Sequence, residues 1–344
     1  MYRLLNLGSK IVASNFKTLK EPYKLTFSIT NKCNSKCKTC GIWKKKNADE
    51  LDLQEIDKIF KKINPLWINI TGGEPFLRND LYEIAEITKK KDAYLLNLTT
   101  NGLLEEKIIN DVNRILKLNF PRFIVVVSLD GSKEVHDKIR GINGNWDKAI
   151  SLFKKLREIE NQNKRFKTYF GYTISSYNIG MLDETLKAVK KETDENLSVF
   201  HFNIFHNSSF YYGEYAGGKI NGLENKILKE IKIILKEKKG IDAISLLEKR
   251  YLKNIQKYFE TGKSPKRCKA LISSCFIAPN GDIYPCTIFN KKLGNLRDFN
   301  YDLKTIWQSD ETNKIRNLIK ENSCGGCWTP CEAYQTILGN ILRK

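Results

Sequence analysis

YKLTFSITNKCNSKCKTC, residues 23–40, decides the fold that this sequence predicts. Its first part, KLTFSIT at 24–30, is rich in β-branched and aromatic residues, which is typical of a strand. Three cysteines, Cys33, Cys37 and Cys40, follow that strand within a single loop. The stretch therefore predicts a buried strand that carries a group of thiols at its carboxyl end.

Strand-like runs recur along the chain, and amphipathic segments separate them. The predicted strands are 24–30, 67–71, 94–100, 122–129, 167–174 and 199–205. The predicted helices between them, with apolar residues three and four positions apart, are 53–63, 81–90, 104–117, 147–159 and 180–192. A strand followed by a helix, repeated along the chain, predicts a parallel sheet. The expected fold class is α/β, a partial (βα)6 TIM-like barrel.

Each predicted strand is followed by residues that suit a binding loop. The sequences that follow the second to the sixth strand are GGEP (72–75), TNG (100–102), SLDG (128–131), SSYN (175–178) and HNSS (206–209). In parallel α/β sheets the chemistry lies in the loops at the carboxyl ends of the strands. These loops and the cysteine loop therefore predict one functional site on one rim of the barrel.

The nine cysteines form two separate groups, of which the first is the group in residues 33–40. The second group consists of Cys268, Cys275, Cys286, Cys324, Cys327 and Cys331. An odd number in tight clusters favours metal binding over a disulfide framework. Three thiols on one loop can hold three corners of a [4Fe–4S] cube and leave the fourth iron open to a reactant. The alternative is a zinc knuckle completed elsewhere in the chain, but it gives no role to the GGEP loop.

The C-x3-C-x2-C spacing after the first strand, with GGEP after the second, resembles the radical S-adenosylmethionine (SAM) superfamily over about residues 23–205. The resemblance implies an enzyme of oxidoreductase, transferase or lyase type whose cluster, on Cys33, Cys37 and Cys40, binds SAM. It also implies reductive cleavage of SAM to a 5′-deoxyadenosyl radical, which takes a hydrogen atom from the substrate. Thr39 stands where similar enzymes often have an aromatic residue, and Trp43 is a candidate replacement.

The same resemblance implies a set of SAM-binding residues on the other rim loops. They are Gly72, Gly73, Glu74, Pro75, Thr100, Asn101, Ser128, Asp130 and Arg140. The glycines would let the backbone approach the methionyl part of SAM. Glu74 would receive its ammonium group, Ser128 and Arg140 its carboxylate, and Asp130 its ribose hydroxyls.

The second cysteine group resembles the SPASM/Twitch extension of some radical SAM enzymes, through Cys268, Gly281, Cys286 and the block CGGCWTPC at 324–331. The resemblance implies a small C-terminal Fe–S cluster-binding domain with one auxiliary [4Fe–4S] cluster that assists electron transfer. Its ligands would be Cys268, Cys275 and Cys286, with one or more of the last three cysteines. Two auxiliary clusters, or a zinc ribbon, are the alternatives. An electron donor of the flavodoxin or ferredoxin type is the implied partner.

Residues after the fifth and sixth predicted strands are expected to face the substrate. The candidates are Tyr172, Asn178, Asn203, His206, Ser208 and Tyr211. This polar, hydroxyl-rich and aromatic set favours a polar small molecule, a sugar or a lipid precursor. His206 is either a proton-transfer group or an ordinary hydrogen-bonded loop histidine. A peptide- or protein-modifying maturase is one alternative. A non-catalytic Fe–S electron-transfer protein is another, but such a protein would have no use for the GGEP loop.

Composition and the termini complete the prediction. The net charge of +20 comes from scattered lysines without an aromatic-interleaved basic stripe, which argues against a nucleic-acid partner. The absence of a membrane-length apolar run and of a secretion signal predicts a cytoplasmic protein. The expected domains are an N-terminal amphipathic helix (1–22), the barrel (23–215), linker helices (216–262) and the C-terminal cluster domain (263–344). The N-terminal helix is expected to pack on the barrel or to make peripheral contact with an anionic membrane.

Overall fold

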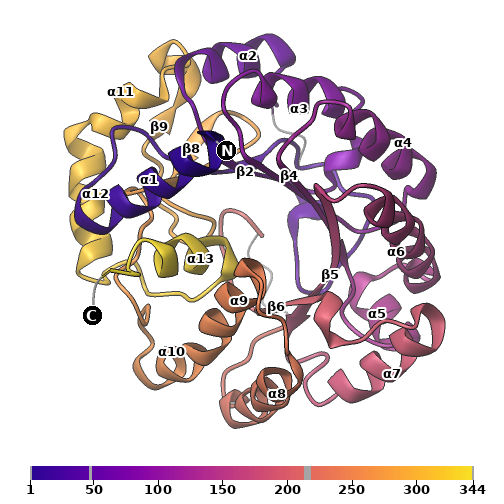
Figure 1. Ribbon diagram of the computed structural model, residues 1–344. Coiled ribbons are helices and arrows are strands. Elements are labelled where there is room, and N and C mark those ends of the chain that lie inside the picture. The colour runs from indigo at the N-terminus through magenta and orange to yellow at the C-terminus, as the bar shows by residue number, and fades with distance from the viewer. Residues whose placement is uncertain (1, 46–48, 213–217, 343–344) are drawn as a thin grey trace.

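The computed structural model describes residues 2–45, 49–212 and 218–342. Its central feature is a curved sheet in which six parallel strands lie in the order β6-β5-β4-β3-β2-β1 (Figure 1). They are β1 (Lys24–Ser28), β2 (Trp67–Thr71), β3 (Leu95–Thr100), β4 (Arg122–Ser128), β5 (Phe166–Ile174) and β6 (Phe200–Ile204). Each agrees with a predicted strand to within two residues at either end. The predicted partial barrel is confirmed.

Helices cover the outer, convex face of this sheet (Figure 1). The five predicted ones are α2 (Leu53–Lys62), α3 (Leu81–Lys89), α4 (Glu105–Leu116), α6 (Asn145–Gln162) and α7 (Leu182–Thr193). A further short helix that the sequence does not predict, α5 (Lys133–Arg140), follows β4. It ends at Gly141, whose φ of +67° takes the chain into the left-handed region that glycine adopts without strain. This ending fixes the position of Arg140 on the rim.

The linker consists of α8 (Glu224–Glu237), α9 (Ala243–Lys253) and α10 (Ile255–Thr261). Helices α9 and α10 are separated at Asn254, within the segment where the sequence predicts linker helices. Helix α9 covers the open edge of β6, where Glu248 accepts a hydrogen bond from the backbone N–H of Phe202 at 2.8 Å. Glu248 also forms an ion pair with buried Lys238 at 2.8 Å. The edge strand therefore has side-chain partners in place of another strand.

The C-terminal segment extends the same sheet on the other side of β1. Strand β7 (Ser274–Ile277) pairs with β1 in parallel, with Cys275 opposite Leu25. Strands β8 (Asp282–Tyr284) and β9 (Gly294–Asn295) then continue antiparallel, which gives a nine-stranded sheet. The sequence does not predict this pairing. The domain boundaries at residues 22, 215 and 262 stay predictions.

Three more helices complete the C-terminal segment: α11 (Leu303–Gln308), α12 (Asp310–Lys320) and α13 (Pro330–Leu338). Trp328 lies just before α13, and its indole N–H donates to the Tyr251 carbonyl of α9 at 2.9 Å. On the other side of α13, the buried Lys24 of β1 donates a hydrogen bond to Gln335 Oε1 at 2.8 Å. Helices α9 and α13 thus span the side of the barrel between β6 and β1. Short 3₁₀ helices lie at η1 (Ile42–Lys44), η2 (Pro75–Leu77), η3 (Leu197–Val199) and η4 (Leu296–Phe299).

The barrel strands have an apolar outer face and a more polar inner face. In β2, Ile68 and Ile70 are fully buried against the covering helices, and the alternate residues Asn69 and Thr71 are half-buried. The same alternation holds in β3, β5 and β6. Many of the side chains that face the interior of the barrel are therefore polar, and most of those on β2, β3, β5 and β6 are only partly buried.

Helix α1 (Tyr2–Phe16) packs at the amino ends of the strands. Its Leu7 belongs to an apolar cluster with Leu19, Tyr23 and Leu66, and Trp67 packs against that cluster. The rim with the predicted motifs is at the opposite, carboxyl end of the strands. None of the helices in the described residues combines the length and hydrophobicity that crossing a bilayer requires.

Candidate functional site

The first cysteine loop is held in place from two sides. The backbone N–H groups of Lys36 and Lys38 donate to the carbonyls of Arg140 and Ile139, at 3.0 and 2.7 Å. On the other side the N–H of Gly41 donates to the Tyr212 carbonyl at 2.6 Å. The loop therefore has a defined position between the end of α5 and the segment after β6.

Cys33 and Cys40 lie in surroundings that disfavour the charged form of their thiols. Burial raises the pKa of Cys33 to about 11 and that of Cys40 to about 12, although the Arg140 charge opposes this shift. The guanidinium of Arg140 donates to Cys37 Sγ at 3.7 Å. Buried thiols become thiolates when a metal centre takes up their charge, so this donor set fits an iron–sulfur cluster.

No three His, Cys, Asp or Glu side chains in the described residues converge on the position of one metal ion. The thiolates of a cube bind different iron atoms and do not need to converge on one point.

The glycine loop after β2 lies directly against the start of the cysteine loop. The N–H of Gly73 donates to the Thr30 carbonyl, and the N–H of Glu74 donates to the Lys32 carbonyl, both at 2.8 Å. A Cβ atom on Gly72 would lie 2.3 Å from Thr30 O, and one on Gly73 would lie 2.1 Å from Lys32 O. The structure thus gives both glycines a packing role against residues 30–32. Their predicted contact with SAM stays a prediction.

Glu74 connects the loops after β2 and β3. Its side chain is 1% exposed and accepts hydrogen bonds from Thr100 Oγ1 at 2.9 Å and from the N–H of Asn101 at 2.7 Å. Burial raises the pKa of Glu74 to about 7, although these hydrogen bonds act to lower it. Pro75 then opens η2. The carboxyl group therefore contributes to the shape of the rim, whatever it contacts in a complex.

Replacing Glu74 with alanine is expected to destabilise the apoprotein. The buried N–H of Asn101 would lose its acceptor, and an unsatisfied buried donor costs about 1–3 kcal/mol. Urea unfolding of the apoprotein measures the loss. Glu158→Ala, at an exposed position on α6, is the control and should have little effect. Equal stability of the two variants would contradict the role of Glu74 in the rim.

Asn101 lies next to the first cysteine loop. Its Nδ2 donates to Asn34 Oδ1 at 2.8 Å and is 3.9 Å from Cys33 Sγ. Asn145 of α6 in turn donates to the Asn101 carbonyl at 2.9 Å. The loops after β1, β2 and β3 thus meet as the sequence predicts.

Arg140 and Asp130 form a buried ion pair at 2.7 Å next to the cysteine loop. Burial alone would lower the pKa of Arg140, but the charge of Asp130, and then that of Cys37, outweighs burial and raises it. The Nε atom of Arg140 has no hydrogen-bond partner in the described part of the chain. Ser128, at the end of β4, is half-buried on the inner face. Asp130 therefore contacts Arg140 here, and its contact with a ribose stays a prediction.

The residues proposed for the substrate lie in three different environments. Asn203 is on the inner face of β6, as expected. Tyr172 is on the outer face of β5, 1% exposed between sheet and helices, and its hydroxyl donates to the carbonyl of fully buried Asn178. The period of two along β5 turns Tyr172 away from the interior, so its placement does not support a substrate role.

The other three substrate candidates join the barrel rim to neighbouring segments. His206 Nε2 accepts from the N–H of Trp328 at 3.1 Å, and Nδ1 lies 2.8 Å from the Ile204 carbonyl. Burial lowers the pKa of His206 to about 4. Ser208 donates to the Thr287 carbonyl at 2.6 Å, and Tyr211 OH is 2.8 Å from Thr71 Oγ1. The structure therefore favours a structural role for His206, whose two ring nitrogens both have protein partners.

The inner face of the strands carries polar residues that the sequence reasoning did not single out. They are Thr26, Ser28, Asn69, Thr71, Asn97, Thr99 and Thr173. The side-chain oxygens Thr26 Oγ1, Ser28 Oγ and Asn203 Oδ1 are buried and have no partner within the described residues. The signal was the polar residue at every second position in WINIT and LLNLTT. Buried polar atoms without a partner on this inner face are groups that a polar ligand would satisfy.

The second cysteine group surrounds β7 and the start of α13. The pKa of Cys327 is raised by burial and then by the charges of Cys286, Cys268, Glu332 and Cys324. These four thiols are therefore near one another. In the described part of the chain no other thiol contributes to the pKa shift of Cys275 or of Cys331. The mutual charge effects therefore connect Cys268, Cys286, Cys324 and Cys327 and do not include the other two cysteines.

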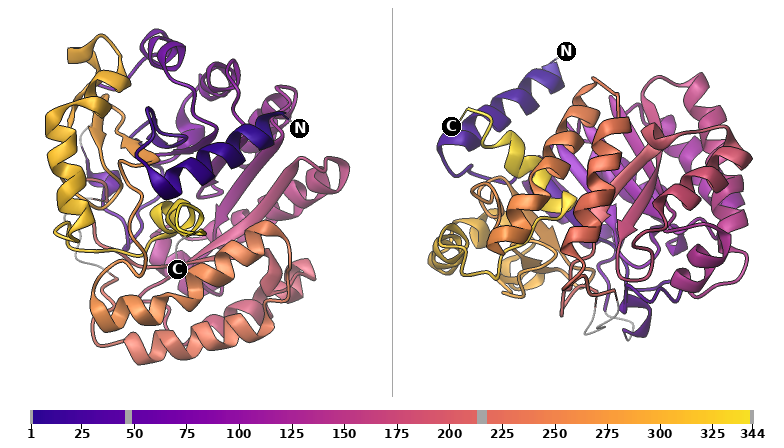
Figure 2. Two further views of the ribbon diagram at one scale, coloured as in Figure 1. Left: turned by 60° about the vertical axis from the view of Figure 1, so that its left-hand side comes forward. Right: turned by 90° about the horizontal axis from the view of Figure 1, so that it is seen from below.

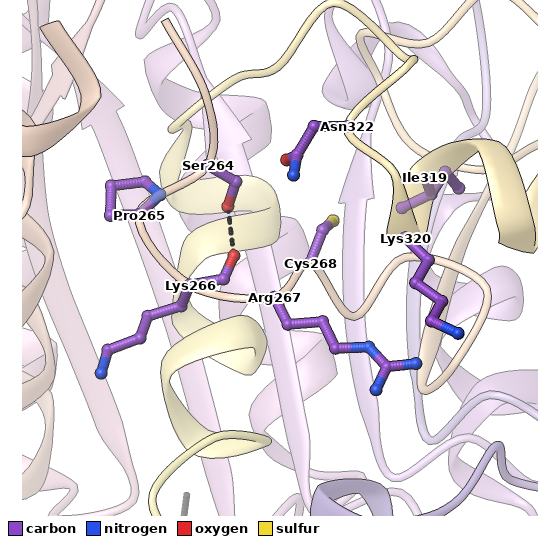
Figure 3. Close-up of a pocket in the computed structure, with 8 residues that line it drawn as sticks. All are labelled: Ser264, Pro265, Lys266, Arg267, Cys268, Ile319, Lys320 and Asn322. Atoms are coloured by element: carbon purple, nitrogen blue, oxygen red, sulfur yellow. Dashed lines mark hydrogen bonds between the residues drawn. The ribbon is translucent and has the colours of Figure 1, made fainter. Parts of the chain in front are cut away.

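A pocket opens beside Cys268, as the close-up in Figure 3 shows. Its lining includes Lys266, Arg267 and Lys320, all exposed and without an ion pair among the described residues. The Ser264 hydroxyl donates to the Lys266 carbonyl at 2.7 Å and shapes one wall. The surface next to the second cysteine group is therefore strongly basic.

Comparison with known proteins gives two family matches. The model of the radical SAM superfamily matches residues 27–189, and that of the SPASM iron–sulfur cluster-binding domain matches residues 268–331. One relative is the antilisterial bacteriocin subtilosin biosynthesis protein AlbA of Bacillus subtilis, which is 24% identical over 95% of this chain and 72% of its own length. Another is the AdoMet-dependent heme synthase of Methanosarcina barkeri, 24% identical over 89% of this chain and 88% of its own length.

The fold is also similar to that of solved structures. SuiB of Streptococcus suis, bound to S-adenosylmethionine, superposes with a TM-score of 0.64 at 17% identity, over 98% of this chain and 77% of that one. The similarity covers the barrel and the C-terminal segment together.

Proposed function

The chain belongs to the radical SAM superfamily and has a C-terminal SPASM domain, and from this premise we propose that it abstracts hydrogen from a polar small molecule. As a member it is an enzyme that uses SAM and a [4Fe–4S] cluster, and the SPASM domain binds auxiliary iron–sulfur clusters. A cluster held by Cys33, Cys37 and Cys40 would supply the electron for reductive cleavage of the S–C5′ bond of SAM, which would release methionine and give the 5′-deoxyadenosyl radical that removes hydrogen from the substrate. The observation that carries the proposal is the contact between the cysteine loop and the GGEP loop on one rim.

Cys33, Cys37 and Cys40 would hold the SAM-binding cluster in this proposal. Their burial and the neighbouring guanidinium of Arg140 support the assignment, because cation and metal both favour thiolates. Arg140 would hold the carboxylate of SAM, with its unpaired Nε as a free donor. Its ion pair with Asp130 keeps the guanidinium charged and oriented.

A polar substrate is supported by the inner face of the barrel. Thr26, Ser28 and Asn203 offer unpaired side-chain oxygens there, and Thr173 and Asn97 lie on the same face. A peptide is the second candidate, because one relative is a bacteriocin biosynthesis protein and SuiB has also been solved with its precursor peptide.

Anaerobic reconstitution with iron and sulfide, followed by SAM and dithionite, tests the function. Formation of 5′-deoxyadenosine supports the enzyme, and its absence with an intact cluster favours a plain electron-transfer protein. Adding a cell extract, before and after protease digestion and after removal of macromolecules, separates the substrate classes. Stimulation that survives both treatments supports a small molecule, and stimulation lost to protease supports a peptide.

Cys268, Cys286, Cys324 and Cys327 would ligate one auxiliary cluster. The mutual effects of their charges on the thiol pKa values support this set, and the pKa shifts of Cys275 and Cys331 show no such effect from another thiol.

Cys327→Ala is therefore expected to lower the iron content by one cluster and to keep the SAM-binding cluster. Cys275→Ala, the matched control in β7, should keep the full iron content. Iron and sulfide analysis with electron paramagnetic resonance measures both variants. Loss of iron in Cys275→Ala, or none in Cys327→Ala, would overturn the assignment.

An electron donor of the flavodoxin or ferredoxin type would reach the enzyme at the basic surface beside Cys268. Lys266, Arg267 and Lys320 support this, because unpaired exposed cations attract an acidic carrier protein.

A further inference from the structure

Helix α1 exposes an apolar stripe on the side that faces away from the protein. The stripe consists of the exposed Tyr2, Leu5, Val12 and Phe16, which lie three, seven and four residues apart on one face of the helix, with the small polar Ser9 between Leu5 and Val12. The exposed fractions are 68% for Tyr2, 64% for Leu5 and 65% for Phe16. Large apolar side chains are rarely exposed next to one another unless they form a surface that binds a partner.

The opposite face of α1 already performs the packing role expected of an amphipathic helix. Leu7 is buried in the cluster with Tyr23 and Leu66, and Asn15 donates to the Leu338 carbonyl at 3.2 Å. The exposed stripe is therefore a second apolar face, which the fold itself does not use.

The C-terminal end of the described chain extends this surface. The N–H of Leu342 donates to Asn15 Oδ1 at 3.1 Å, which holds the end of the chain against α1. Ile341 and Leu342 are 50% and 57% exposed. Figure 2 shows α1 and the C-terminal end side by side at one end of the molecule. We define the apolar surface as Tyr2, Leu5, Val12, Phe16, Ile341 and Leu342.

The charged side chains of α1 and of residues 17–20, which follow it, are all basic. Residues 2–20 contain no Asp or Glu, and they include Arg3, Lys10, Lys17 and Lys20. Lys10, Lys17 and Lys20 form no ion pair with any described residue, and Arg3 is 3.9 Å from Asp92. The complementary partner is therefore anionic as well as apolar.

We propose that the apolar surface docks the enzyme on an anionic lipid membrane, with α1 lying in the plane of the headgroups. An interfacial helix needs an exposed apolar face with bulky side chains and flanking basic residues, and α1 has both. The helix stands on the protein as a ridge, which suits insertion into a fluid headgroup layer. A protein partner would have to supply a matching groove.

The proposal goes beyond the proposed function and does not depend on it. Helix α1 lies at the amino ends of the strands, against Tyr23 and Leu66, whereas the cysteine and glycine loops follow the carboxyl ends. The bound enzyme would keep its reactive rim directed away from the bilayer. The substrate would then arrive from the aqueous side.

Sedimentation of the holoprotein with sucrose-loaded vesicles tests the proposal. Vesicles of phosphatidylglycerol and phosphatidylcholine should bind the protein, and added salt should weaken this binding because it screens the lysines. Leu5→Glu and Phe16→Glu should each lower the partition coefficient at least about tenfold, because a large apolar side chain is lost from the interface. Ile241→Glu, at a position 85% exposed outside α1, is the matched control and should bind like the wild type.

Iron content and thermal unfolding of each variant show whether it is folded, and the exposed positions predict that both stay unchanged. Absence of wild-type binding to anionic vesicles would overturn the proposal, as would equal binding by Phe16→Glu. Light scattering without lipid gives an independent check. A wild-type dimer that Leu5→Glu converts to a monomer would assign the surface to a second copy of the chain instead.

Discussion

Cys37→Ala is expected to abolish 5′-deoxyadenosine formation and to leave the auxiliary cluster in place. Cys37 is buried, and its sulfur lies 3.7 Å from the Arg140 guanidinium and 3.2 Å from Ser35 Oγ. No other thiol on that loop would be spare, because the proposed cluster would use all three cysteines. Loss of one ligand would then remove both the cluster and the position at which SAM would bind.

Chromatography of the reaction mixture measures 5′-deoxyadenosine, and iron analysis measures the clusters independently of activity. Lys36→Ala, an exposed position in the same loop, is the matched control and should keep both signals. Iron content equal to that of the wild type in Cys37→Ala, with normal product formation, would show that Cys37 is not a ligand.

Gly73→Ala is expected to produce the second large effect, although it adds only a methyl group. The added Cβ would lie 2.1 Å from Lys32 O, 2.6 Å from Lys32 C and 2.8 Å from Asn31 O. These are backbone atoms, so no side-chain rotation relieves the overlap, and the loop before Cys33 must move. We expect a loss of about 3 kcal/mol or more in the free energy of unfolding and weaker SAM binding.

Urea unfolding of the apoprotein and equilibrium SAM binding by the reconstituted protein measure the two effects. Gly8→Ala is the control, because a Cβ there has nothing within 4 Å and the residue lies inside helix α1. It should stabilise the protein by up to about 1 kcal/mol through helix propensity. A Gly73→Ala protein as stable as Gly8→Ala would contradict the close packing of the two loops.

The sequence predicts the six barrel strands well because local pattern and burial agree there. KLTFSIT and RFIVVVSL are strand-like on any local criterion, and each is followed by a polar loop. The pairing of β7 with β1 is not predictable in this way, because it joins residues some 250 positions apart. The break between α9 and α10 at Asn254 is also missed, because apolar spacing alone does not mark it.

The candidate site shows the same division between local and tertiary information. Motif spacing places Cys33, Glu74 and Asn101 correctly on adjoining loops. It does not distinguish the two faces of β5, both of which carry aromatic and polar side chains, and so the prediction that Tyr172 faces the substrate does not fit its burial on the outer face. The ion pair of Arg140 with Asp130 depends on α5, which the sequence does not predict.

The hydrogen-bonded ladder between β1 and β7 has a mechanical consequence. Leu25 and Cys275 are partners in that ladder, so the strand that leads to the first cysteine loop and the strand inside the second cysteine group belong to one rigid sheet. A hinge between barrel and C-terminal segment would have to break this ladder. The distance between the two cysteine groups is therefore set when the protein folds, and it does not depend on movement of one part of the protein against the other.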